Sequence, residues 1–97
     1  MSKISKWEYK MIEELEENGL KILMYLQERE EAKLSDFKMD LRMGSNAVYR
    51  ILTVLLYKYK LITEEFKGVS RIFRLTERGK KVAGYLKLAD QALSEGP

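Results

Sequence analysis

The apolar residues near the start of the chain recur at intervals of three and four, which predicts amphipathic helices. The first run contains Ile4, Trp7, Met11, Ile12 and Leu15. It predicts a helix from about Ser2 or Ser5 to Asn18, where Asn18-Gly19 supplies a stop because glycine adopts the left-handed conformation at little cost. A second run predicts a central core helix from about Leu20 to Glu30.

Two further helices are predicted after a short extended segment at 32–34. Ser35 is a suitable N-cap for the third helix, and Phe37 and Leu41 give that helix a buried side. The fourth helix begins at Gly44 or Ser45 and runs to about residue 58. Its buried stripe consists of Val48, Ile51, Leu52, Leu55 and Tyr59. Its opposite side is polar and carries Asn46, Tyr49, Arg50 and Thr53.

Alternation of apolar and polar residues then predicts a β-hairpin. Its strands are 61–66 and 71–75, joined by a turn at 67–70 that contains Gly68. Phe73 and Leu75 are expected on the buried face, with Ile72 on the other. Thr76 is the expected N-cap of a last helix that ends near residue 94.

These elements predict a single domain that is mainly α with a small β-hairpin, an α+β fold. Residues 1–19 form an N-terminal helix, 20–76 form the core with its helix-turn-helix and hairpin, and 77–97 form a C-terminal helix with a frayed tail. This order of elements is that of a winged helix-turn-helix with extra terminal helices. In that fold the second helix of the motif fits the major groove of DNA, and the hairpin contacts the flanking backbone.

Charge is distributed unevenly and supports a polyanionic partner. The net charge of the 97 residues is only +3. Residues 32–97, however, hold thirteen basic and seven acidic residues, a net charge of +6, while residues 1–31 are net acidic. Localised positive charge increases both the affinity and the association rate for nucleic acid. A solvated, lysine-rich surface is the alternative explanation.

The composition argues against chemistry by the protein itself. The chain contains no cysteine and no histidine, which removes the usual zinc ligands and the commonest general base. We therefore expect no enzymatic activity, no metal and no cofactor. No apolar run approaches the roughly 18 residues that a membrane helix needs. We expect a soluble protein of the cytoplasm, with no membrane partner.

Two segments resemble the winged-helix domains of small prokaryotic transcription regulators of the MarR, PadR and ArsR types. Residues 47–52 followed by Leu61-Ile62 resemble a recognition helix that leads into the first wing strand, and residues 73–79 resemble the second wing strand and the closing helix. The turn departs from the pattern, with Arg42 where glycine is frequent and Gly44 where serine is frequent. The resemblance implies a transcriptional regulator, associated with the nucleoid, that binds double-stranded DNA as a homodimer. It leaves open whether a small-molecule effector exists.

The candidate DNA-binding residues lie on the recognition helix at 45–58, on the turn before it and on the wing at 66–71. They are Arg42, Ser45, Asn46, Tyr49, Arg50, Thr53, Lys67, Ser70 and Arg71. Arg50 either contacts a guanine or a phosphate, or it pairs within the protein with Asp36 or Asp40. Asn46 either reads adenine or helps to cap the helix. Tyr49 either contacts a sugar or a phosphate of the DNA, or it packs against the preceding helix. The wing either contacts DNA or is a solvated hairpin turn.

Apolar stripes on the two terminal helices predict a homodimer, because a core of this size cannot bury both of them. The candidate dimerisation residues are Trp7, Met11, Leu15, Val82, Tyr85, Leu86, Ala89 and Leu93. The alternative is that both stripes fold back onto their own chain. A symmetric dimer would place two recognition helices about one DNA turn apart, roughly 34 Å.

Two other functions are compatible with the same pattern. Besides a sequence-specific regulator, the chain could be an architectural protein that coats DNA without sequence preference. It could also be a winged-helix module that binds another protein. A regulator should prefer its own site by at least about 10³ over unrelated duplexes, whereas a coating protein should not.

Overall fold

The computed structural model describes the backbone of residues 2–95 and the side chains of residues 13–95. The elements follow in the order α1 (Ser2–Arg29), β1 (Ala32–Lys33), α2 (Leu34–Asp40), α3 (Ser45–Thr53), a π-helical turn η1 (Val54–Lys58), β2 (Ile62–Lys67), β3 (Ser70–Leu75) and α4 (Glu77–Glu95). The prediction of a mainly helical α+β fold with a small hairpin is confirmed. No helix in the described part of the chain is long and apolar enough to cross a membrane.

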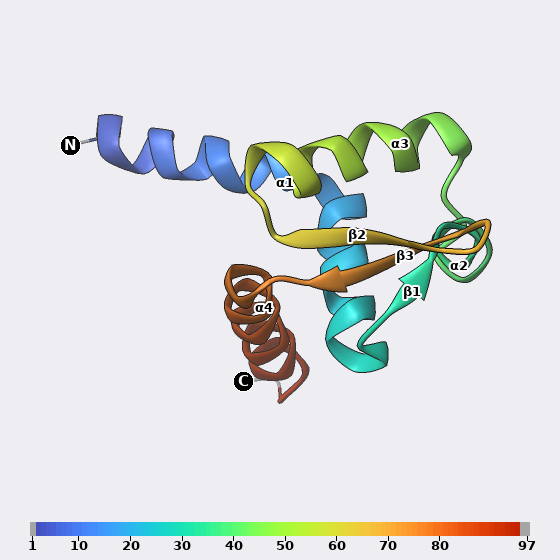
Figure 1. The fold of residues 1–97 in the computed structure, drawn as a ribbon. Coiled ribbons are helices and arrows are strands. Elements are labelled where there is room, and N and C mark those ends of the chain that lie inside the picture. The colour runs from blue at the N-terminus through green and yellow to red at the C-terminus, as the bar shows by residue number, and fades with distance from the viewer. Residues whose placement is uncertain (1, 96–97) are drawn as a thin grey trace.

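The sheet is antiparallel with the order β1-β3-β2, and β3 lies at its centre. The helices α1, α2 and α3 gather around this sheet, and the hairpin tip extends beyond them next to α2 (Figure 1). Lys67 pairs with Ser70, so Gly68 and Val69 form a two-residue turn. Gly68 has φ 64°, a conformation that glycine adopts without steric cost.

One continuous core joins the helices to one face of the sheet. It includes Ile22 and Leu23 of α1, Val48 and Leu52 of α3, and Phe73 of β3, none of which is more than 2% exposed. The predicted stripe of the fourth helix is therefore buried, apart from Tyr59, which is half-buried. The expected burial of Phe73 is confirmed.

The prediction for the hairpin faces was incomplete at Ile72. This residue was expected on the face turned away from the core, yet it is only 4% exposed. β3 is the central strand, so Ile72 lies between Lys33 of β1 and Glu65 of β2. The neighbouring strands cover it, whereas Leu75, at the end of the strand, is only half-buried.

The first two predicted helices are one helical element with a break, and the break lies at a different residue from the one expected. Asn18 and Gly19 are helical, whereas Glu16 has φ 55° and ψ 173°. Gly19 serves a different purpose, since a Cβ added there would lie 3.2 Å from the side chain of Ile51. The small residue permits α1 and α3 to approach closely.

The start of α2 was also placed too late. Lys33, not Ser35, is the N-cap, and its backbone N–H donates to Asp36 Oδ2 at 2.9 Å. The carboxylate of Asp36 thus reaches back from the first turn and satisfies the backbone N–H of the N-cap residue, as the N3 side chain of a capping box does. Of the two predicted N-caps of the fourth helix, Gly44 and Ser45, the structure has Gly44, and α3 begins at Ser45.

The last helix is fixed at its start by several polar contacts. Thr76 Oγ1 accepts from the backbone N–H of Gly79 at 3.0 Å, which confirms the predicted N-cap. Thr76 also donates to the carbonyl oxygen of Lys60 at 2.8 Å, and Arg78 donates to that of Tyr59 at 3.2 Å. These contacts attach α4 to the segment that joins η1 to β2.

Candidate nucleic-acid interface

The α3 helix separates its apolar and polar residues as predicted. Val48, Ile51 and Leu52 are buried, while the opposite side is exposed to solvent. We call this exposed side the reading face; it consists of Asn46, Tyr49, Arg50 and Thr53. An amide, a phenol, a guanidinium and a hydroxyl on one helix are the groups that can hydrogen-bond to base edges and phosphates.

Three residues of the reading face have partners within the protein. Arg50 donates through Nη1 to Glu16 of α1, so its acidic partner is neither Asp36 nor Asp40. Thr53 Oγ1 donates to the carbonyl oxygen of Tyr49 at 3.0 Å. The ring of Tyr49 lies 5.5 Å from Lys38 Nζ of α2, within the range of a cation–π contact.

The two acidic residues that were considered as partners of Arg50 have other contacts. Asp40 accepts from the hydroxyl of Tyr25 at 2.6 Å. That hydrogen bond to a carboxylate raises the pKa of the Tyr25 phenol, because ionisation would place two negative charges together. Asp36 caps α2, as described above. Asp36 and Asp40 are close to Arg50 in the sequence, but that closeness did not predict which carboxylate binds the arginine.

Arg71 is not an unpaired cation at the wing tip, which corrects part of the predicted wing. Its guanidinium donates to Glu64 Oε2, with the Nε–Oε2 distance at 3.0 Å, and lies 5.2 Å from the Phe73 ring centre. Arg71, Glu64 and Phe73 share the face of the hairpin that is turned toward the helices, which is why the pair is half-buried. Lys67 and Val69 remain exposed at the tip.

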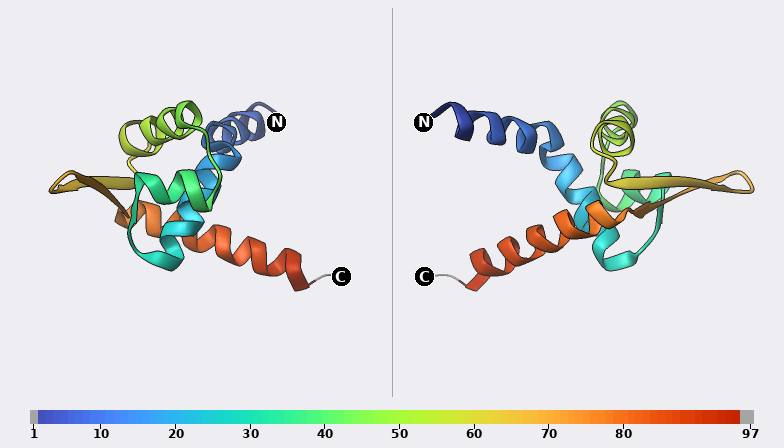
Figure 2. Two further views of the ribbon diagram at one scale, coloured as in Figure 1. Left: turned by 90° about the vertical axis from the view of Figure 1, so that its right-hand side faces the viewer. Right: turned by 60° about the vertical axis from the view of Figure 1, so that its left-hand side comes forward.

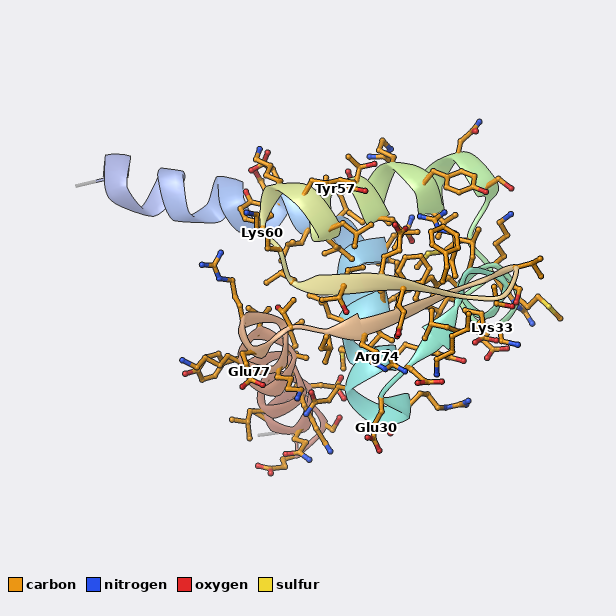
Figure 3. All side chains as sticks on the ribbon, viewed as in Figure 1. Glu30, Lys33, Tyr57, Lys60, Arg74 and Glu77 are labelled. Atoms are coloured by element: carbon orange, nitrogen blue, oxygen red, sulfur yellow. The ribbon has the colours of Figure 1, made fainter. Side chains whose placement is uncertain are left out.

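A shallow cleft of roughly 280 Å³ separates α2 from the hairpin tip. We call it the basic cleft; it is lined by Lys33, Leu34, Ser35, Lys38, Val69, Ser70 and Arg71. Lys33 extends from the sheet edge beneath the hairpin tip (Figure 3). Ammonium and hydroxyl groups in one cleft are suitable donors for phosphate oxygens. Of these residues, sequence reasoning had selected only Ser70 and Arg71.

The cations of the described residues differ in whether an acidic side chain pairs with them. Four cations on β1, on α2, on the following turn and on the hairpin form no ion pair with any residue from 13 to 95; they are Lys33, Lys38, Arg42 and Lys67. Three other described cations are paired with acids of α1. Lys58 of η1, for example, donates to Glu14, and this contact raises the pKa of the lysine. Among residues 13–95, Lys60 after η1 and Lys81 of α4 also form no ion pair. What distinguishes the first group is that Lys38 lies 5.5 Å from the Tyr49 ring of the reading face.

The outer face of the sheet carries a separate ionic network. Arg74 donates to Glu31 Oε1 at 2.6 Å and also binds Glu65 of the neighbouring strand. The guanidinium lowers the pKa of the Glu65 carboxyl because it stabilises the charged form. Arg74, Glu30 and Glu31 border a hollow of roughly 400 Å³ beside α4 (Figure 3). No side chain that was predicted to bind DNA lines this hollow.

The candidate dimerisation residues divide into two sets. Leu15, Val82 and Leu86 are partly buried and pack against their own core, as the alternative of intramolecular packing expects. Tyr85 and Leu93 are 71% and 83% exposed. Ala89 is exposed as well, together with Leu88, which was not predicted. The side chains of Trp7 and Met11 lie outside the described residues.

The first part of α1 and the last part of α4 project from the body on the same side (Figure 2). The hairpin points in another direction, away from both helices. The exposed stripe of α4 thus lies apart from the reading face and the basic cleft. A partner bound to this stripe would leave α3 and the hairpin accessible.

Comparison with known proteins gives no family assignment. No protein-family model matches this chain, and no curated protein has a significantly similar sequence.

Proposed function

We propose that this chain is a winged helix-turn-helix protein that binds duplex DNA as a homodimer and regulates transcription. The order of its helices and strands and the β1-β3-β2 sheet support this fold, as does the sequence resemblance to winged-helix regulators. In this proposal α3 enters the major groove, and the hairpin contacts the flanking backbone. The nucleoid in the cytoplasm is the corresponding location.

The observation that carries this proposal is the position of unpaired cations beside an exposed polar helix face. Lys38 lies 5.5 Å from the Tyr49 ring of the reading face, and Lys33 lines the same basic cleft as Lys38. Neither these two lysines nor Arg42 and Lys67 form an ion pair with any residue from 13 to 95. A duplex that presents bases to Asn46 would place its phosphates near these cations. The phosphate contacts are therefore reassigned in part from Arg71 to the lysines of the basic cleft.

Salt dependence of DNA binding tests the proposal. If a dimer neutralises about six phosphates, the logarithm of its affinity should fall with the logarithm of salt concentration with a slope near −5. Replacing Lys33 and Lys38 with glutamine should reduce affinity at least about tenfold at 0.1 M salt and flatten the slope. Fluorescence anisotropy with a labelled duplex measures both quantities.

A matched control changes the same charge elsewhere. Lys81 and Lys87 are exposed on α4, so their replacement with glutamine should have a much smaller effect. A wild-type slope near zero would contradict DNA binding and favour a protein partner. Equal effects of the two double variants would show that only total charge matters.

A specific observation also supports the architectural alternative. The unpaired cations suit phosphates, which carry no sequence information, while Arg50 is engaged by Glu16. Selection from random duplexes, followed by sequencing, separates the two functions. An enriched palindrome with half-sites about one turn apart supports a dimeric regulator. No enrichment, together with strong salt-dependent binding, supports a coating protein.

The dimer is tested by a single substitution on α4. Tyr85→Glu should shift the protein from dimer to monomer in sedimentation velocity without loss of helicity, because Tyr85 is 71% exposed in the monomer. Gln91→Glu adds a negative charge on another exposed side of the same helix and should leave the dimer intact. A wild-type chain that sediments as a monomer at all concentrations would refute the homodimer.

A further inference from the structure

Glu16 marks the point where α1 changes direction, and its backbone is unusual. Its φ of 55° and ψ of 173° fall in a region that is almost restricted to glycine. Residues held in such conformations need support from the surrounding structure, and they concentrate at functional sites. Glycine is nevertheless absent at this position, and the glycine of α1 is three residues later, at Gly19. The side chain of Glu16 is therefore the feature to explain.

That side chain reaches the reading face. Glu16 Oε2 accepts from Nη1 of Arg50, which lies 34 positions later in the sequence. Nearby, Glu14 accepts from Lys58 and from the hydroxyl of Tyr59. These contacts join the break in α1 to the helix formed by α3 and η1. An acidic residue thus lies directly beside the arginine that faces the candidate DNA surface.

The contact leaves part of the guanidinium free. Within residues 13–95, Arg50 donates to Glu16 through Nη1 alone, and the arginine side chain is 60% exposed. An arginine has five N–H donors in a planar fork, so Nε and Nη2 still present two donors along one edge. Such an edge matches the O6 and N7 acceptors of guanine.

The carboxylate of Glu16 affects phosphate and guanine differently. A phosphate oxygen is anionic and would approach Arg50 against the negative charge of Glu16, or it would have to displace it. Guanine O6 and N7 are neutral acceptors, so they bind the free edge without this repulsion. Like charges placed together across an interface reduce the affinity of wrong partners more than that of the correct one.

We propose that Glu16 is a specificity-determining residue, which holds the guanidinium of Arg50 for a guanine edge and prevents its capture by phosphate. This inference rests on the DNA binding proposed above. It concerns the ratio between specific and nonspecific affinity, whereas the lysines of the basic cleft determine the total affinity. Glu16 acts through Arg50 and needs no contact with DNA of its own.

The test compares Glu16→Gln with Glu17→Gln. Both changes remove one negative charge from α1, but Glu17 pairs with Lys21 at 2.9 Å and has no contact with Arg50. Affinities are measured for a duplex obtained by selection and for an unrelated duplex over a range of salt concentrations. Each glutamine variant is also combined with Arg50→Ala. Circular dichroism verifies that the variants keep the wild-type fold.

We expect Glu16→Gln to increase affinity for the unrelated duplex about fivefold and for the selected duplex less than about twofold. Its salt slope on the unrelated duplex should steepen by about one unit, because Arg50 gains a phosphate. Glu17→Gln should affect both duplexes equally and weakly. With Arg50→Ala present, the two glutamine variants should behave alike.

Three results would overturn the inference while DNA binding itself stands. One is an equal change for both duplexes in Glu16→Gln, matching Glu17→Gln. Another is an undiminished effect of Glu16→Gln when Arg50 is alanine. A wild-type protein with no preference between duplexes would also refute a role in specificity. Failure of the wild type to bind either duplex would refute the proposed function as well.

Discussion

Replacement of Gly79 with alanine is expected to cause a large loss of stability, because α4 lies directly against the backbone at Leu61. A Cβ at position 79 would be 1.9 Å from the Leu61 carbonyl oxygen and 2.9 Å from its carbon. The same oxygen accepts from the backbone N–H of Thr76 at 3.0 Å. Relief of the clash therefore requires α4 to move off the core and lose that bond. We expect a decrease of at least about 3 kcal/mol in the free energy of unfolding.

Urea denaturation followed by circular dichroism measures this change. Gly84→Ala is the matched control on the same helix, since a Cβ at position 84 would meet no atom within 4 Å. It should stabilise the protein by about 0.5–1 kcal/mol, because alanine loses less backbone entropy than glycine in a helix. Equal stability of the two variants would show that α4 does not contact Leu61 in solution.

The second large effect is expected from Phe73→Ala. Phe73 is fully buried on the central strand, and its ring centre lies 5.6 Å from that of Phe37 of α2. Removal of the ring would leave a cavity where the sheet meets the helices. Such substitutions of buried aromatic residues cost about 3–5 kcal/mol, from lost burial and from the cavity.

A second phenylalanine in the same hairpin provides the control. Phe66 shares the inward face with Phe73, yet it is 65% exposed because the hairpin tip extends beyond the helices. Phe66→Ala should change the unfolding free energy by no more than about 0.5 kcal/mol. A cost for Phe66→Ala close to that of Phe73→Ala would indicate that the tip is covered in solution, for example by a second chain. The midpoints of urea unfolding separate these cases.

Local patterns in the sequence were sufficient to predict most elements and their buried sides. Intervals of three and four gave the face of α3 with Val48 and Leu52, and alternation gave the hairpin around Gly68. These predictions succeeded because a helix or strand places residues on its faces by a fixed period, whatever it contacts. The N-cap at Thr76 succeeded for a similar reason, since it depends on residues close in sequence.

The predictions that failed depended on neighbours distant in sequence. Glycine is a residue type that often ends helices, but Gly19 lies within α1, where α3 comes so close that a small residue is needed. Ile72 appeared to be an outward residue, but β1 and β2 flank it on both sides. Neither neighbour can be identified from a local period. The break at Glu16 had no sequence signal, because glutamate rarely adopts that conformation.

For the candidate site, the sequence identified which side chains lie outside but not which of them are paired. Arg50 and Arg71 were selected as candidate DNA-binding residues, with Asp36 or Asp40 considered as an internal partner of Arg50, yet both arginines are bound to glutamates. Lys33 and Lys38 were not selected, and the fold brings them into the cleft beside the hairpin tip. The availability of a charge depends on every acidic group within reach, which is a property of the assembled fold.

By itself, the sequence determined the helix and strand periods, the buried stripe of α3, the excess of positive charge after residue 31 and the absence of cysteine and histidine. These properties depend on residue types and on short-range backbone geometry. Only the tertiary structure decided that Glu16 meets Arg50 and that Gly79 lies on Leu61. Such contacts join distant segments, and their geometry is fixed only when the common core brings those segments together.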